Sequence, residues 1–98
     1  MSASGAAVNE RLHARVRGIV QGVGFRYFTR ESAARLELTG WVRNIPDGSV
    51  ELIAEGPRDR LESLLEALND GPHGSAVRGV ASDWLEATGE FEDFGVRA

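Results

Sequence analysis

Two segments alternate apolar and polar side chains with the period of two that predicts a strand with one buried face. In residues 11–17, Leu12, Ala14 and Val16 alternate with arginine and histidine. Residues 49–55 have the inward positions Val50, Leu52 and Ala54 and the outward positions Ser49, Glu51, Ile53 and Glu55. Residues 40–44 predict another strand, residues 77–84 one with weaker alternation, and residues 94–97 a short last one.

Two other segments have the spacing of amphipathic helices. One helix is predicted over residues 27–36, with Phe28, Ser32, Ala33 and Leu36 on one face. The second begins after the Gly-Pro pair at 56–57 and ends at the Gly-Pro pair at 71–72. Its apolar stripe consists of Leu61, Leu64, Leu65 and Leu68.

The elements follow the order β-α-β-β-α-β with one more short strand at the end. Packing both helices on one face of a mostly antiparallel sheet buries their stripes and gives an α+β sandwich. We expect this single domain to span residues 10–98, and residues 1–9 to be a disordered N-terminal tail. Outward arginines of the first strand would lie beside outward glutamates of the third, as solvated pairs worth well under ~1 kcal/mol each.

The charge of the chain is unevenly distributed. Its 98 residues carry a net charge of −4, but residues 11–43 hold seven arginines against Glu31 and Glu37. An acidic chain is not typical of a nucleic-acid binder, whereas a locally positive segment suits a small anion. The sequence has no membrane-spanning apolar run and no signal-peptide pattern, so we expect a cytoplasmic protein without a membrane partner. Its small size favours a monomer.

Several chemistries are excluded by residue type. The chain has no cysteine and no lysine, which excludes disulfides, thiolate metal sites and Schiff-base catalysis. His13 and His73 lack the spacing of metal ligands, and no serine has an evident catalytic partner, so we expect no metal and no cofactor. The acids between Asp83 and Asp93 are typical of a solvated loop.

The segment 18–26, Gly-Ile-Val-Gln-Gly-Val-Gly-Phe-Arg, joins the first strand to the first helix. Glycines bring backbone N–H groups close to a ligand, and a helix N-terminus attracts anions. An arginine can hold two phosphate oxygens at once. The candidate anion-binding residues are therefore Gln21, Gly22, Val23, Gly24, Phe25 and Arg26.

This segment resembles the first signature of the acylphosphatases. The segment Gly40-Trp41-Val42-Arg43-Asn44, followed by Gly48, Val50 and Gly56, is similar to the second signature of that family. The resemblance covers about residues 11–97 and implies a ferredoxin-like sandwich. It also implies metal-free hydrolysis of the carboxyl–phosphate bond of acyl phosphates, with inorganic phosphate as product and competitive inhibitor. In that family the arginine that closes the first signature binds phosphate and the asparagine that closes the second positions water, so the resemblance implies that Arg26 and Asn44 are catalytic.

The residue types suit this chemistry. The departing carboxylate has a conjugate acid with a pKa of about 4, so no general acid is needed at neutral pH. What remains is to hold the phosphoryl group and to align a water molecule. A carboxamide can orient water but is a very weak base, so we expect the substrate's own phosphate oxygen to take the proton.

Two other functions remain open on the sequence. A non-catalytic module that senses phosphate would need the glycine loop but not Asn44. An RNA-recognition domain shares the order of elements, but residues 49–55 lack the aromatic side chains that such domains place on central strands. One position departs from the family pattern, because Glu37 stands where glycine is common after the first helix. A left-handed backbone there would cost roughly 1 kcal/mol.

Overall fold

The computed structural model describes residues 8–98. The elements are β2 (Asn9–Ile19), α1 (Phe25–Arg35), β3 (Thr39–Asn44), β4 (Val50–Pro57), α2 (Arg58–Asp70), β5 (Ala76–Glu86) and β6 (Phe94–Arg97). Most of the predicted tail at residues 1–9 lies outside the described residues, although Asn9 already begins β2.

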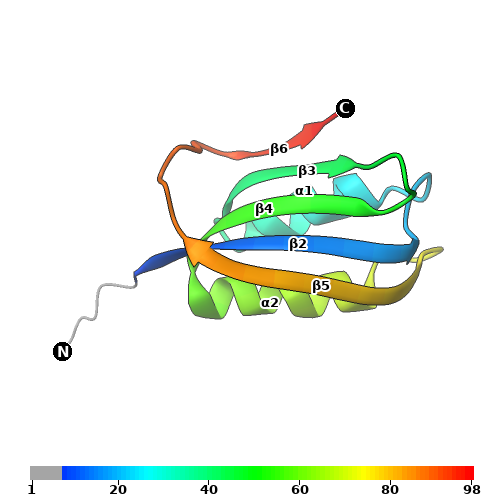
Figure 1. The fold of residues 1–98 in the computed structure, drawn as a ribbon, viewed down its shortest axis with the longest axis horizontal. Helices are drawn as coiled ribbons and strands as arrows, with labels where there is room; N and C mark the ends of the chain where they lie inside the picture. Colours follow the sequence, from blue (N-terminus) through cyan, green and yellow to red (C-terminus); the bar gives the residue numbers. More distant parts are fainter. Residues whose placement is uncertain (1–7) are drawn as a thin grey trace.

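The strands of the described chain form one five-stranded sheet in the order β5-β2-β4-β3-β6. β3 and β6 are parallel, and the other neighbouring strands are antiparallel. Both helices cover the same face of this sheet (Figure 1). The predicted α+β, ferredoxin-like architecture is therefore confirmed.

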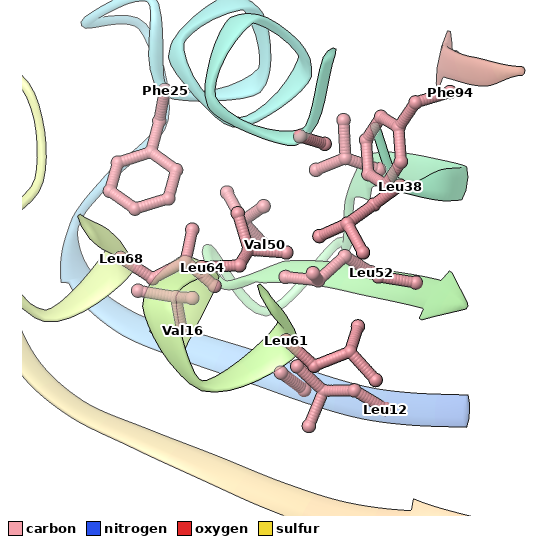
Figure 2. Close-up of a cluster of buried hydrophobic side chains, with 14 of the residues drawn as sticks. Leu12, Val16, Phe25, Leu38, Val50, Leu52, Leu61, Leu64, Leu68 and Phe94 are labelled. Carbon is pink, nitrogen blue, oxygen red and sulfur yellow. The ribbon is translucent and has the colours of Figure 1, made fainter. Parts of the chain in front are cut away.

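The core lies between this face and the two helices. The stripe of α2 contributes Leu61, Leu64 and Leu68, which are fully buried and face the inward side chains of β2 and β4 (Figure 2). Phe25 at the start of α1 is also buried. Removing each such side chain from water stabilises the fold by about 1.5–3 kcal/mol. Because Phe25 anchors the start of α1, packing also fixes where the preceding glycine loop ends.

Helix α1 begins two residues earlier than its pattern predicted. Gly24 is the N-cap, with a left-handed φ of 74°, and its carbonyl accepts a hydrogen bond of 2.9 Å from the Phe28 N–H. Glycine adopts this conformation without strain, so the helix can start directly at Phe25. At the other end, Glu37 has a φ of 57°, the left-handed backbone that the family pattern predicted.

The uncovered face of the sheet is less exposed than predicted. Ser49, Ile53 and Glu55 are buried, although all three were assigned outward positions. Ile53 lies between cross-strand neighbours His13 and Trp41. Glu55 is covered because the segment after β5, predicted to be solvated, folds back over it and donates hydrogen bonds from Thr88. The prediction of a fully open face was wrong at these positions.

Candidate active site

The loop that follows β2, the turn between β3 and β4, and the C-terminal end of β6 lie at the same end of the sheet, on the right in Figure 1. The loop contains Gly22 and Gly24, whose φ angles are 75° and 74°. No side chain of the described residues caps the N-terminus of α1, and the first turn of this helix contains no acid. The first N–H groups of a helix have no intrahelical partner, so this end can donate to an anion.

Gln21 ties the loop to the turn between β3 and β4. Its Nε2 donates to the backbone carbonyl of Ile45 at 2.8 Å and to that of Ser49 at 2.9 Å. The turn is itself stabilised because the Asp47 carboxylate accepts hydrogen bonds from the hydroxyl and backbone N–H of Ser49, which hold the pKa of Asp47 below its usual range. Gln21 thus connects segments that are far apart in the sequence.

Arg26 lies in the first turn of α1. Its Nη1 donates a hydrogen bond of 3.0 Å to the backbone carbonyl of Arg97, at the end of β6. A carbonyl fixes the direction of the guanidinium without neutralising its charge, and four further N–H donors remain. Arg26 is therefore oriented and still positively charged toward a ligand.

Asn44 is the last residue of β3. Its Oδ1 is buried and accepts no hydrogen bond from the described part of the chain. A buried acceptor without a partner costs about 1–3 kcal/mol, and such groups are uncommon in folded proteins. This oxygen is thus suited to accept a hydrogen bond from a small polar ligand or from water.

A pocket of about 350 Å³ brings these features together. The predicted site residues that line it are Gly22, Gly24, Phe25, Arg26 and Asn44. Gln21 and Val23, which were also predicted, are not among the lining residues, since Gln21 donates to the turn and Val23 packs against the core. Arg26 and Asn44 come from separate signatures, so the fold has placed two distant segments around one pocket.

The sequence interpretation missed four lining residues. They are Val20, Tyr27, Arg30 and Val96. Arg30 follows Arg26 by four residues and Tyr27 by three, so helical spacing could have placed all three on one side of α1. Val96 could not have been found this way, because its presence depends on β6 pairing with β3.

Residues 8–98 lack the features of a metal site and of a membrane-spanning helix. No group of three or more histidine, cysteine or acidic residues is arranged to hold a metal ion there. Among the same residues, no helix is long and apolar enough to cross a membrane.

Comparisons with known proteins identify the family of this chain. A family model described as acylphosphatase matches residues 12–96. The acylphosphatase of Salinibacter ruber is 58% identical over 88 residues, which are 90% of this chain and 93% of that protein. The crystal structure of acylphosphatase from Bacillus subtilis has a TM-score of 0.88 and 37% identity, covering 91% of this chain and 99% of that one. An acylphosphatase structure from Coxiella burnetii has a TM-score of 0.82 and 44% identity, covering 92% and 94%. With both signatures in one pocket and a family model matching nearly its whole length, the chain belongs to the acylphosphatase family.

Proposed function

We propose that this chain hydrolyses the carboxyl–phosphate bond of acyl phosphates, releasing a carboxylate and inorganic phosphate. Its family makes it a hydrolase. The observation that carries the proposal is that the Arg26 guanidinium and the Asn44 carboxamide line one pocket in which no lining residue is acidic. Such a pocket can hold an anion and a water molecule side by side.

The phosphoryl group binds at the glycine loop. Gly22 and Gly24 leave the backbone uncovered, and the uncapped N-terminus of α1 contributes N–H donors and a partial positive charge. Arg26 supplies the full charge and several donors for the phosphoryl oxygens. These groups stabilise the charge on the equatorial oxygens during transfer, which is the main demand of phosphoryl-transfer catalysis.

Asn44 positions the attacking water. Its buried Oδ1 accepts a hydrogen bond from that water, which gives the unpartnered acceptor a partner when substrate binds. The carboxamide N–H₂ group of the same side chain donates either to the water or to a phosphoryl oxygen. Holding the water in line with the carboxylate leaving group converts an encounter in solution into an oriented attack.

No general acid is required, because the leaving carboxylate is stable at neutral pH without a proton. Asn44 is too weak a base to deprotonate the water, so a phosphoryl oxygen of the substrate takes this proton. The P–O bond to water forms as the P–O bond to the carboxylate breaks, and the products are a carboxylate and inorganic phosphate. We expect a chelator to leave turnover unchanged.

The direct test is hydrolysis of benzoyl phosphate by the purified chain, with inorganic phosphate added as a competitive inhibitor. We expect turnover well above the spontaneous rate, and inhibition by phosphate. Binding of phosphate without turnover would instead identify a phosphate-sensing module of the same fold. Neither binding nor turnover would contradict both functions.

A further inference from the structure

The pocket contains a second arginine that the proposed reaction does not use. Arg30 lines the pocket together with Arg26, and no acidic residue does so, although the whole chain has a net charge of −4. Arg30 follows Arg26 by four positions, which places it about 6 Å further along α1 from the loop. The pocket is therefore positive beyond the phosphoryl position as well as at it.

Tyr27 orients Arg30. The Arg30 guanidinium lies over the Tyr27 ring, 5.0 Å from the ring centroid. Tyr27 is 59% exposed, so its ring forms a platform at the mouth of the pocket and is not part of the core. A cation held against an aromatic face keeps its N–H donors at the ring edge, where they can reach a ligand.

Arg30 also borders a second hollow lined by Glu31, Glu37, Glu92 and Asp93, but its one ion pair within the described residues, with Glu31, leaves it available. Glu31 approaches at 3.7 Å, but both side chains are 44% exposed, and such surface pairs contribute little. Glu31 itself does not line the pocket. A carboxylate of the substrate, held on the pocket side of α1, could bind Arg30 without displacing a strong ion pair.

With the phosphoryl group at the glycine loop, the acyl part of the substrate extends toward the mouth, where Tyr27, Arg30 and Val96 lie. We propose that Arg30 is a specificity-determining residue that selects acyl phosphates whose acyl part carries a second negative charge, with Tyr27 as its positioning residue. This inference rests on the proposed acyl phosphate hydrolysis. It identifies a substrate class, the monophosphoryl derivatives of short dicarboxylic acids, that the two family signatures do not specify.

The test compares succinyl phosphate with butyryl phosphate, which have equal chain length and differ in a terminal carboxylate or methyl group. After subtraction of spontaneous hydrolysis, we expect the intact chain to prefer succinyl phosphate in kcat/KM by about two- to fivefold, the size of a partly exposed ion pair. Arg30→Gln should remove this preference, mainly by raising KM for succinyl phosphate. Added salt should reduce the preference in the intact chain, since the pair is close to solvent.

Three further variants separate recognition from structure. Tyr27→Leu should lower the succinyl preference, whereas Tyr27→Phe should retain it because the ring face is kept. Arg35→Gln removes an exposed arginine from the same helix that does not line the pocket, and should leave the preference unchanged. Hydrolysis of both substrates with equal efficiency, or an equal loss for both in Arg30→Gln, would overturn the inference alone. Hydrolysis of neither would overturn the proposed function and this inference with it.

Discussion

Two polar clusters of this small domain differ in how completely their members bind one another. The first, which we call the Glu55 cluster, consists of Arg11, Glu55, Thr88, Gly89 and Glu90 on the sheet face opposite the helices. The second is the pocket around Arg26 and Asn44. Both combine a guanidinium with other polar groups, but only the first is saturated with internal partners.

In the Glu55 cluster, each carboxylate oxygen of Glu55 has a donor. Arg11 Nε and the Thr88 N–H donate to Oε2 at 2.7 and 2.9 Å, and the Gly89 N–H donates to Oε1 at 3.0 Å. The side chain is only 3% exposed. Burial by itself raises the pKa of Glu55, but these hydrogen bonds outweigh it and hold the pKa below its usual range. The cluster stabilises the fold and has little capacity left for a ligand.

The pocket has the opposite character. Within residues 8–98, Asn44 Oδ1 is buried without a donor, and Arg26 has a backbone carbonyl as acceptor but no carboxylate among the pocket residues. The comparison teaches that polar residues with complete internal hydrogen bonding serve the fold, whereas those left with unused capacity are the candidates for binding a ligand.

The largest effect is expected for Asn44→Ala. Losing the group that orients water should lower kcat for benzoyl phosphate by about 10²–10³-fold, while the inhibition constant of inorganic phosphate changes little. Steady-state kinetics with phosphate as inhibitor measure both. Asn69→Ala, at an exposed position of α2, is the matched control. A collapse of phosphate affinity with turnover intact would show that the roles are assigned wrongly.

Arg26→Lys should impair both binding and turnover. Lysine keeps the charge but loses the planar fork, so we expect weaker phosphate inhibition and a kcat/KM lower by about 10²-fold. The same assay measures this change, and Arg35→Lys in the last turn of α1 is the control. An unchanged phosphate inhibition constant would argue against Arg26 as the phosphate ligand.

Much of the fold follows from the sequence, because alternation and helical spacing report which side of an element is buried. The strand around Val16, the inward positions of β4 around Leu52, and Leu61, Leu64 and Leu68 of α2 agree with their patterns. The burial of Glu55 could not be predicted, since it depends on where the segment after β5 crosses the sheet. Local pattern contains no information about such a return of the chain.

The candidate site was also predictable only where local sequence determines it. The two signatures identified Arg26 and Asn44, and the pocket contains both. The sequence offered no obvious acyl-side pocket, whereas in the structure Arg30 and Tyr27 also line the pocket, because α1 presents one side of its first turns to it. The carbonyl of Arg97 that orients Arg26 requires the parallel pairing of β3 and β6, which no local pattern reveals.

Glu55→Gln should be the most destabilising of the carboxylate changes. The amide keeps the shape but removes the charge that Arg11 and two backbone N–H groups bind, at a cost of about 2–3 kcal/mol. Urea unfolding followed by circular dichroism measures the loss. Glu66→Gln on the exposed side of α2 should change stability by less than about 0.5 kcal/mol. If both variants unfold alike, the Glu55 cluster is not a structural centre.

Acid should weaken the fold through the carboxylates of Glu51 and Glu55. A hydrogen bond from His13, together with Arg43, lowers the pKa of Glu51, and the pKa of Glu55 is lowered as well. Because both folded pKa values lie below the unfolded value of about 4.3, the folded state binds fewer protons near that pH. Stability should therefore be fully present above about pH 5 and fall as the pH drops through the folded values.

Urea midpoints measured from pH 7 to pH 3 test this dependence, and Glu55→Gln should show a shallower profile. A midpoint that stays constant or rises on acidification would contradict the assignment. Activity at neutral pH should be unaffected by these groups, since neither lies in the pocket.

The smallest effect concerns Glu37, which belongs to neither cluster. The hydrogen bonds from Glu37 N–H to Ala34 and from Leu38 N–H to Ala33 form a Schellman motif, in which glycine is preferred at the left-handed position. Glu37→Gly should stabilise the chain by up to about 1 kcal/mol, less the exposed ion pair with Arg60. Glu37→Ala loses the same ion pair without relieving the backbone, so glycine should melt higher than alanine. Equal melting temperatures would refute the strained cap.

The side chain of Gln21 joins the two segments that line the pocket. By donating to the carbonyls of Ile45 and Ser49, it fastens the loop ending at Arg26 to the hairpin that begins at Asn44. The two halves of the pocket are therefore preorganised relative to one another, and a ligand need not spend binding free energy on assembling them. In this chain of 98 residues, a single side chain thus holds the two halves of the pocket in place before a ligand arrives.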